Sequence, residues 1–564
     1  MPVFPLDSQP EPRLTFRIVT LGCKVNQYES EQLRQALVDS GLICLDGKDE
    51  KAGQEDETHS GVETHSGTET HSGTETHFGA ETHFRVEKDG FFEFPVSEEG
   101  KRNEVSADSL RLNWFFVNTC AVTQESEAKS RKMIRQIIKR CHPENVLVFG
   151  CSAENDSAQF AAIPGVTHVV TGEAYGGNRI AAVLAVVGEC VSSMRSDSSA
   201  VSELSVPSDS STSLVSSVSL VSLVSSSSVS SVSPSSASSV IFDSCTRSLE
   251  SGLRRFGERH RAYVKVQDGC RQFCTYCLIP HLRHELTSVP VEEVQTEVRS
   301  LLRHGYREII ITGIHLGYYG LNPRGRSQMV WRIEDRQKPR QTNLTDLMER
   351  LAKMELEPVC GTEAAFSEPE FRLRISSLEA HEAGDDLLQI MAENRARICP
   401  HLHLSMQSGS PSVHHRMNRP GTIEQYVERC ESAKRILDQP ALTTDVIVGF
   451  PGETEQEFLE TCDVVRRIGF SKIHIFPFSA RPGTPAARLG GFIPNEEKHR
   501  RELYLAEIER EMHEKFVESL KGRQTQFLIE RFHSETQTVT GTSEYYLQEE
   551  FPGSVEDVGR FLMR

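Results

Sequence analysis

Short apolar runs alternate with amphipathic helical patterns along most of the chain, an arrangement typical of parallel β-sheets covered by helices. In the N-terminal part, three β-rich apolar runs each end at a cysteine, at residues 17–23, 114–120 and 146–151. Helical patterns extend from Ser30 to Ser40 and from Ala128 to Arg140. We therefore predict a doubly wound α/β domain over residues 15–190.

The alternation continues with six further apolar strands, near residues 263–266, 308–312, 372–376, 401–405, 444–448 and 472–476. Amphipathic helices separate several of them; one has an apolar stripe from Val291 to Leu302 and is followed by Gly305, a favourable C-cap. Six β/α units predict an open partial (β/α)6 barrel of the TIM type over residues 256–490. A long charged helix at about 495–520 and a short β-rich tail at 520–564 complete an α/β fold.

Two segments interrupt this pattern. Residues 46–108 are acidic and contain a six-residue repeat, Glu-Thr-His-Ser-Gly-x, whose histidines are His59, His65, His71, His77 and His83. Regular histidines allow a metal-binding interpretation. A duplicated polar insert, too poor in apolar residues to order itself, is the interpretation we favour, and we predict disorder. Residues 191–250 are dominated by Ser and Val and are predicted to be a disordered linker.

The net charge and the mean hydropathy bear on which partners the protein can have. The 564-residue chain has a formal net charge of −18, but residues 46–108 alone carry 17 Asp/Glu against 6 Lys/Arg. Because most of the acidity lies in that insert, the net charge does not exclude an RNA partner. Mean hydropathy is −0.39, and no run is apolar enough to cross a bilayer. With no signal-peptide pattern at the start, we expect a cytoplasmic protein without a membrane partner.

The clearest candidate for a metal-binding site is a Cys-x3-Cys-x2-Cys loop formed by Cys270, Cys274 and Cys277. Soft thiolate ligands select zinc, Cu(I) or iron–sulfur centres. A structural zinc would need a fourth protein ligand, whereas a 4Fe–4S cluster held by three cysteines leaves one iron open for chemistry. A zinc knuckle and free buried thiols are the alternatives.

A second candidate triad is formed by the cysteines that end the three N-terminal apolar runs: Cys23, Cys120 and Cys151. Ligand sites of open α/β sheets lie beyond the carboxyl ends of their strands, so the three are expected to lie close together in space. Taken singly, each could also be an ordinary buried cysteine.

Both triads resemble one family, the radical S-adenosylmethionine (SAM) methylthiotransferases, over about residues 16–561 apart from the inserts. The stretches that carry the resemblance are LGCKVNQYES from Leu21, NTCAVT from Asn118, the three-cysteine loop with Leu278-Ile279-Pro280, and DVIVGFPGET from Asp445. The resemblance implies that Cys270, Cys274 and Cys277 hold a 4Fe–4S cluster whose open iron binds SAM, which is cleaved reductively to a 5′-deoxyadenosyl radical. It also implies that Cys23, Cys120 and Cys151 hold an auxiliary 4Fe–4S cluster that supplies or carries sulfur.

Within the family, the stretch Lys24 to Ser30 and the sequence Thr312-Gly313-Ile314-His315 look like one of the subgroups that act on tRNA. Its substrate is N6-threonylcarbamoyladenosine next to the anticodon. The implied partners are tRNA, a low-potential electron donor of the flavodoxin or ferredoxin type, and a sulfur source. The alternatives are methylthiolation of isopentenyladenosine or of a ribosomal-protein aspartate, another radical SAM reaction, and a non-catalytic RNA-binding protein with a structural metal.

The resemblance also implies binding residues. SAM is expected to contact Tyr276, Gly313, Gly449 and Glu453. A carboxylate on the substrate would suit a bidentate arginine, and Arg283 and Arg481 are the candidates, with structural ion pairs as the alternative.

The tail at 520–564 resembles the small TRAM β-barrel that binds tRNA, and we expect it to be one strand short. After Pro280, His284 and Val289 stand where the family commonly has Gly and Arg, which leaves altered activity as one possibility.

Overall fold

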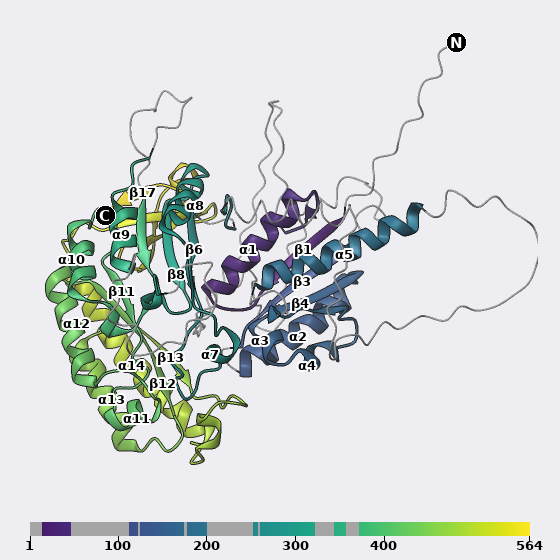
Figure 1. Ribbon diagram of the computed structural model, residues 1–564. Coiled ribbons are helices and arrows are strands. Elements are labelled where there is room, and N and C mark those ends of the chain that lie inside the picture. Colours follow the sequence, from purple (N-terminus) through teal and green to yellow (C-terminus); the bar gives the residue numbers. More distant parts are fainter. Residues whose placement is uncertain are drawn as a thin grey trace, which may run out of the picture.

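The computed structural model describes residues 14–46, 112–121, 124–173, 178–199, 252–257, 260–321, 343–356 and 371–564 (Figure 1). The acidic insert predicted at 46–108 lies outside these residues except for Asp46, and so does the predicted linker from residue 200 to 250. No helix within the described ranges combines the length and apolar character that spanning a bilayer requires.

The N-terminal domain is built on a parallel five-stranded sheet of order β2-β1-β3-β4-β5. The strands are β1 Thr15–Thr20, β2 Ile43–Cys44, β3 Trp114–Thr119, β4 Asn145–Gly150 and β5 His168–Val169. Successive side chains of a strand point to opposite faces. Trp114 and Phe116 therefore join one buried cluster, whereas Phe115 and Val117 join another.

Helices cover both faces of this sheet, as the sequence predicts. The helices are α1 Lys24–Asp39, α2 Gln124–Cys141, α3 Cys151–Asn155, α4 Ser157–Ala161 and α5 Arg179–Ser199. Residues of α1 and α5 pack against one cluster, and residues of α2 and α4 against the other. Helix α5 continues past Val191, where the sequence placed the start of the linker, and Val191 itself is buried in the domain core.

The central domain is the predicted partial barrel, made of two four-stranded sheets of order β7-β6-β8-β9 and β10-β11-β12-β13. The strands are β6 Arg261–Asp268, β7 Thr287–Ser288, β8 Glu308–Gly313, β9 Arg372–Ile375, β10 Ser377–Leu378, β11 His401–Leu404, β12 Ala441–Val448 and β13 Lys472–Pro477. All are paired in parallel except β7, which is antiparallel to β6. The six predicted strands are confirmed.

Helices surround the outside of the barrel (Figure 1). They are α8 Val291–Arg303, α9 Leu344–Ala352, α10 Asp385–Glu393, α12 Ile423–Leu437, α13 Glu455–Ile468 and α14 Asn495–Ser519. Two shorter helices lie apart from this core: α7 Ile279–Leu282 contacts α3, and α11 Pro411–Arg416 joins a separate buried cluster. Alternate strand residues such as Ile309, Ile311 and Leu373 pack in the core beneath them. Several of the intervening residues on the same strands, among them Glu308 and Arg374, are polar and buried, so the barrel interior is not an ordinary apolar core.

A small antiparallel sheet of order β16-β15-β14-β17 ends the chain. Its strands are β14 Gln526–His533, β15 Thr538–Ser543, β16 Gln548–Pro552 and β17 Phe561–Met563.

The small sheet docks on the end of the barrel where the strands begin. Arg372 donates to the backbone carbonyls of Gln526 and Thr542 at 2.9 and 2.7 Å. Arg374 donates to the carbonyls of Ser543 and Glu544 at 3.0 Å each.

Glu308 neutralises both arginines. Its carboxylate accepts from Arg372 at 2.6 Å and from Arg374 at 2.8 Å. Burial alone would raise the pKa of Glu308, but Arg374 and Arg372 outweigh that effect and lower it. The Glu308 carboxylate therefore bridges two arginines whose guanidinium groups also donate hydrogen bonds to the small C-terminal sheet.

We expect Glu308→Gln to destabilise the protein by about 3–5 kcal/mol, because it leaves two buried guanidinium groups without their anion. The measurement is the urea midpoint followed by fluorescence and far-UV circular dichroism. Glu349→Gln, which removes an exposed partner of Lys353 on α9, is the control and should leave the midpoint unchanged. Equal midpoints for Glu308→Gln and the wild type would contradict the role given to Glu308.

Candidate functional site

The three N-terminal cysteines follow the ends of three adjacent parallel strands. Cys23 precedes α1 after β1, Cys120 follows β3, and Cys151 begins α3 directly after β4. The strand register pairs Thr20 with Asn118, and Thr119 with Gly150, so the chain leaves all three strands at the same edge of the sheet. The structure thus brings the three cysteines to one edge.

Side chains around this edge fix its shape. The Asn26 amide donates to Asn118 Oδ1 at 2.8 Å and to the Thr119 carbonyl at 3.0 Å, which ties the first turn of α1 to the end of β3. Gly150 has φ +100°, and a Cβ there would lie 2.4 Å from Asn118 Oδ1. Only glycine therefore lets β4 approach β3 so closely just before Cys151.

One of these thiols has a shifted pKa. Although the Cys23 residue is exposed, desolvation by the protein around its thiol raises the pKa of Cys23, and the neighbouring Cys151 raises it further. A metal centre would bind the thiolates and release those protons.

The second triad lies in the loop between β6 and α7, at the carboxyl end of the barrel strands. Gly269 opens the loop with φ +86°, where a Cβ would lie 2.0 Å from the Glu285 carbonyl oxygen. The loop is pinned where the Thr275 N–H donates to the Met417 carbonyl at 3.0 Å and the Ala486 N–H donates to the Thr275 carbonyl at 2.8 Å.

The three thiols of the loop influence one another. Burial raises the pKa of Cys277 to about 12, and the nearby Cys274 and Cys270 contribute to the increase. The loop therefore brings together three thiols of the kind that a thiolate-binding metal centre uses.

The spacing of the thiols bears on which centre fits. Two sulfurs bound to one zinc ion lie about 3.8 Å apart, given Zn–S bonds of about 2.3 Å and tetrahedral angles. Among the described residues, one group of three potential ligands has all its ligand atoms within 4.8 Å of one another, and it contains no cysteine. Among the described residues, therefore, neither triad has all three sulfur atoms within 4.8 Å of one another. Thiolates are ligands of iron–sulfur clusters as well as of zinc.

Arg283 connects the two triads. Its backbone carbonyl accepts the Cys270 N–H at 3.0 Å, and its Nε lies 3.5 Å from Cys151 Sγ. Its terminal nitrogens donate to both oxygens of Glu29, at 2.7 and 2.8 Å, and to Asp268 at 2.9 Å. Burial would raise the pKa of Glu29, but Arg283 and Lys265 outweigh it and lower the pKa.

Arg481 is placed in the same way. It is 2% exposed and donates to the two carboxylate oxygens of Glu127 on α2, at 3.2 and 2.7 Å. Arg283 and Arg481 therefore both form ion pairs across the interface with the N-terminal domain, which is the alternative that the sequence left open. Their binding of substrate stays a prediction.

The residues expected near SAM lie at the same end of the barrel as the cysteine loop. Gly313 ends β8 and Gly449 follows β12 with φ +73°. Tyr276 is packed against a buried cluster that contains Phe450. Glu453 holds the turn itself, since it accepts the Gly449 N–H at 2.7 Å and pairs with Arg501 at 2.7 Å.

His315 is a site residue whose role the sequence did not reveal. Its Nδ1 lies 3.5 Å from Cys270 Sγ, and its Nε2 lies 2.6 Å from Glu382. Its ring stacks on Tyr318 at a centroid distance of 3.8 Å. The sequence Thr312 to His315 marked the residue, but nothing in the sequence pointed to Glu382, which is 67 positions away.

The two departures from the family pattern differ in their surroundings. His284 is exposed, and its carbonyl accepts from Arg271 at 3.2 Å. Val289 packs against the barrel core, and its backbone pairs with Val266. Val289 thus has a structural role that an arginine could not fill in the same way.

Comparison with known proteins agrees with this arrangement. The model of the radical SAM superfamily matches residues 264–465, and the model described as Uncharacterized protein family UPF0004 matches residues 98–172. The threonylcarbamoyladenosine tRNA methylthiotransferase of Bacillus subtilis is 30% identical over 452 residues, which cover 79% of this chain and 84% of the relative. That of Chlamydia pneumoniae is 28% identical over 538 residues, covering 95% and 91%.

A relative with another printed substrate also matches. The tRNA-2-methylthio-N(6)-dimethylallyladenosine synthase of Carboxydothermus hydrogenoformans is 31% identical over 270 residues, which cover 48% of this chain and 55% of the relative. Taken with the two cysteine triads and the partial barrel, these matches show that the chain belongs to the radical SAM tRNA methylthiotransferase family.

Proposed function

We propose that this enzyme converts N6-threonylcarbamoyladenosine next to the anticodon of tRNA to its 2-methylthio derivative. The observation that carries the proposal is the extent of similarity. Relatives named for threonylcarbamoyladenosine align over 74–97% of this chain, whereas relatives named for the dimethylallyl substrate align over 48–57%.

As a member of the family, the protein is a transferase that uses SAM and two 4Fe–4S clusters. We infer that Cys270, Cys274 and Cys277 hold the cluster that binds SAM, and that Cys23, Cys120 and Cys151 hold the auxiliary cluster. When bound, the first supplies radical chemistry from SAM and the second supplies sulfur. Tyr276, Gly313, Gly449 and Glu453 would line the SAM site, because they lie at the strand ends beside the cysteine loop.

The rest of the chain positions these groups. Arg283 and Arg481 fix the N-terminal domain against the barrel, so that the two triads face a common region. The small C-terminal sheet would contact tRNA, which is the substrate macromolecule of the family. A flavodoxin- or ferredoxin-like electron donor and a sulfur source complete the reaction, which we place in the cytoplasm.

Substrate choice is tested by giving the anaerobically reconstituted protein three tRNA pools, bearing threonylcarbamoyladenosine, isopentenyladenosine or unmodified adenosine at the same position. We expect methylthio product from the first pool only. A site that binds a polar group rejects an analogue lacking it by roughly 10⁴-fold or more. Nucleoside mass spectrometry measures the product, and 5′-deoxyadenosine is measured in parallel.

Cys270→Ala serves as the inactive control for all three pools. Methylthiolation of the isopentenylated pool alone would move the chain to the sister substrate while leaving the radical chemistry intact.

A further inference from the structure

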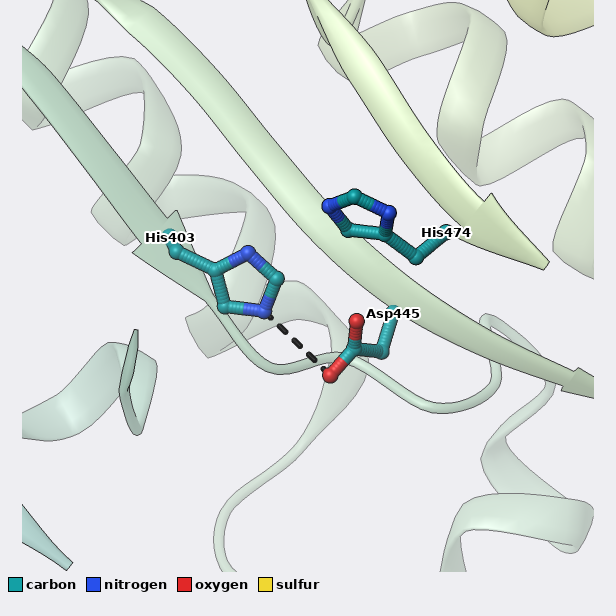
Figure 2. Close-up of side chains that lie close together, drawn as sticks. All are labelled: His403, Asp445 and His474. Atoms are coloured by element: carbon teal, nitrogen blue, oxygen red, sulfur yellow. Dashed lines mark ion pairs between the residues drawn. The ribbon is translucent and has the colours of Figure 1, made fainter. Parts of the chain in front are cut away.

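Three potential metal ligands converge inside the barrel, and none of them is a cysteine. His403, Asp445 and His474 come from the adjacent strands β11, β12 and β13, and their ligand atoms all lie within 4.8 Å of one another (Figure 2). His403 Nε2 lies 3.3 Å from Asp445 Oδ2.

The backbone holds these side chains rigidly. Asp445 and His474 are direct partners in the register of β12 and β13, and His403 is the direct partner of Thr443. All three positions alternate with residues such as Leu402 and Ile473 that pack outward, so their side chains point into the barrel.

Hydrogen bonding orients the His403 ring but leaves one of its two nitrogens without a partner. Its Nδ1 lies 3.0 Å from the Thr443 hydroxyl, which fixes the ring and directs Nε2 toward Asp445. Nε2 is buried and has no hydrogen-bond partner by geometry, despite its distance of 3.3 Å from the carboxylate. Within the described residues, no hydrogen bond to the His474 ring is formed either.

The distance suits a shared ion better than a direct hydrogen bond. N–H···O bonds cluster at about 2.9–3.0 Å. Two ligands bound to one tetrahedral ion at about 2.0–2.2 Å lie about 3.3–3.5 Å apart. The 3.3 Å separation of His403 Nε2 and Asp445 Oδ2 falls in that range.

The charge states also favour a metal ion at neutral pH. Burial lowers the pKa of His474 to about 4, which the attraction of Asp445 only partly offsets, so its imidazole is neutral. Burial would raise the pKa of Asp445, but His403, His474 and Lys24 outweigh it and lower the pKa. Neutral imidazole and ionised carboxylate are the forms that coordinate metals.

We propose that His403, Asp445 and His474 bind one divalent transition-metal ion of the Zn²⁺ or Fe²⁺ class, in addition to the two iron–sulfur clusters. Two imidazoles and one carboxylate form the ligand set of many zinc and non-haem iron sites that keep positions open for another ligand. Lys24 is the competitor, because its positive charge also acts on Asp445.

Metal analysis of the full-length protein tests the site. The anaerobically reconstituted protein is incubated with a small excess of Zn²⁺, desalted, and analysed for zinc and iron by mass spectrometry. We expect one zinc per chain beside about eight irons. His474→Ala and Asp445→Asn should weaken zinc binding at least tenfold without lowering the iron content, and a Zn²⁺ titration gives the affinities.

His304→Ala is the matched control, since it removes an exposed histidine at the end of α8 and should leave zinc binding unchanged. Absence of retained zinc would mean that Lys24 is the partner of Asp445, and the proposal would be wrong. Equal zinc in the wild type and both variants would overturn it too, because the metal would then lie elsewhere, for example on the histidine repeat.

Discussion

Alanine at Cys270, Cys274 or Cys277 is expected to abolish 5′-deoxyadenosine formation from SAM and, with it, all methylthio product. Alanine at Cys23, Cys120 or Cys151 should leave SAM cleavage and remove only the methylthio product. The reason is that the two triads stand on different sheets and, in the proposed function, perform different chemistry. Anaerobic assays of both products in the same reaction measure the separation.

Arg283 contacts both Cys151 and the backbone of Cys270, so a substitution in one triad can disturb the other. The iron content of each variant is therefore measured as a control. Each variant should keep about four of about eight irons per chain. Cys430→Ala, a buried cysteine of α12, should keep both activities and all the iron. Normal methylthio product from any of the N-terminal cysteine variants would show that the auxiliary triad has been assigned wrongly.

The second large effect concerns Arg283, whose replacement by alanine should destabilise the protein by about 3–5 kcal/mol. The variant removes the bidentate partner of the buried Glu29 and leaves Lys265 as the remaining cation beside Glu29 and the half-buried Asp268. Thermal unfolding measured by fluorescence, together with limited proteolysis at the interface, gives the size of the effect.

The effect should depend on pH with a definite sign. The pKa values of Glu29 and Asp268 are lowered in the folded protein: burial opposes the shift, but the attraction of Arg283, followed by that of Lys265, outweighs it. The stability they contribute is complete above their unfolded pKa values, about 4, and is lost as the pH falls through the lowered ones. The difference between wild type and Arg283→Ala should therefore be largest at neutral pH and shrink in acid.

Arg254→Ala offers a matched control at the same interface. Arg254 pairs with Asp39 of the N-terminal domain, but its side chain is 45% exposed, so its loss should change stability little. A pH-independent loss in Arg283→Ala would indicate packing rather than charge as the contribution of Arg283.

Periodicity alone predicted most of the fold. Most strands of the N-terminal sheet and of the barrel are short apolar runs. In the N-terminal sheet a cysteine follows the end of β3 and of β4, so these two strands were located to within one or two residues. Helices such as α9 and α10 were missed, because each has only 9 residues and follows a long insertion or a loop. In the same way, Val191 was assigned to a linker although it packs in the core, since its contacts come from distant strands.

The residues of the candidate site could likewise be predicted only in part. Cysteines placed at strand ends could be grouped from the sequence, because topology brings strand ends together. The pairs Arg283–Glu29 and Arg481–Glu127 could not, since 254 and 354 residues separate the partners. His403, Asp445 and His474 escaped notice for a related reason: single polar residues in apolar strands point to one place only once the barrel is closed.

The docking of the last sheet by Arg372 and Arg374 constrains how the protein can be divided. Small β domains are often exchangeable modules, joined to their neighbours by a linker and little else. Here the backbone carbonyls of that sheet accept hydrogen bonds from two buried arginines at the start of the barrel strands. A barrel separated from its tail, or recombined with a foreign one, would lose these carbonyl acceptors and leave Glu308 as the partner of both arginines. The barrel and the C-terminal sheet must therefore be kept together in any truncated or chimeric form of the protein.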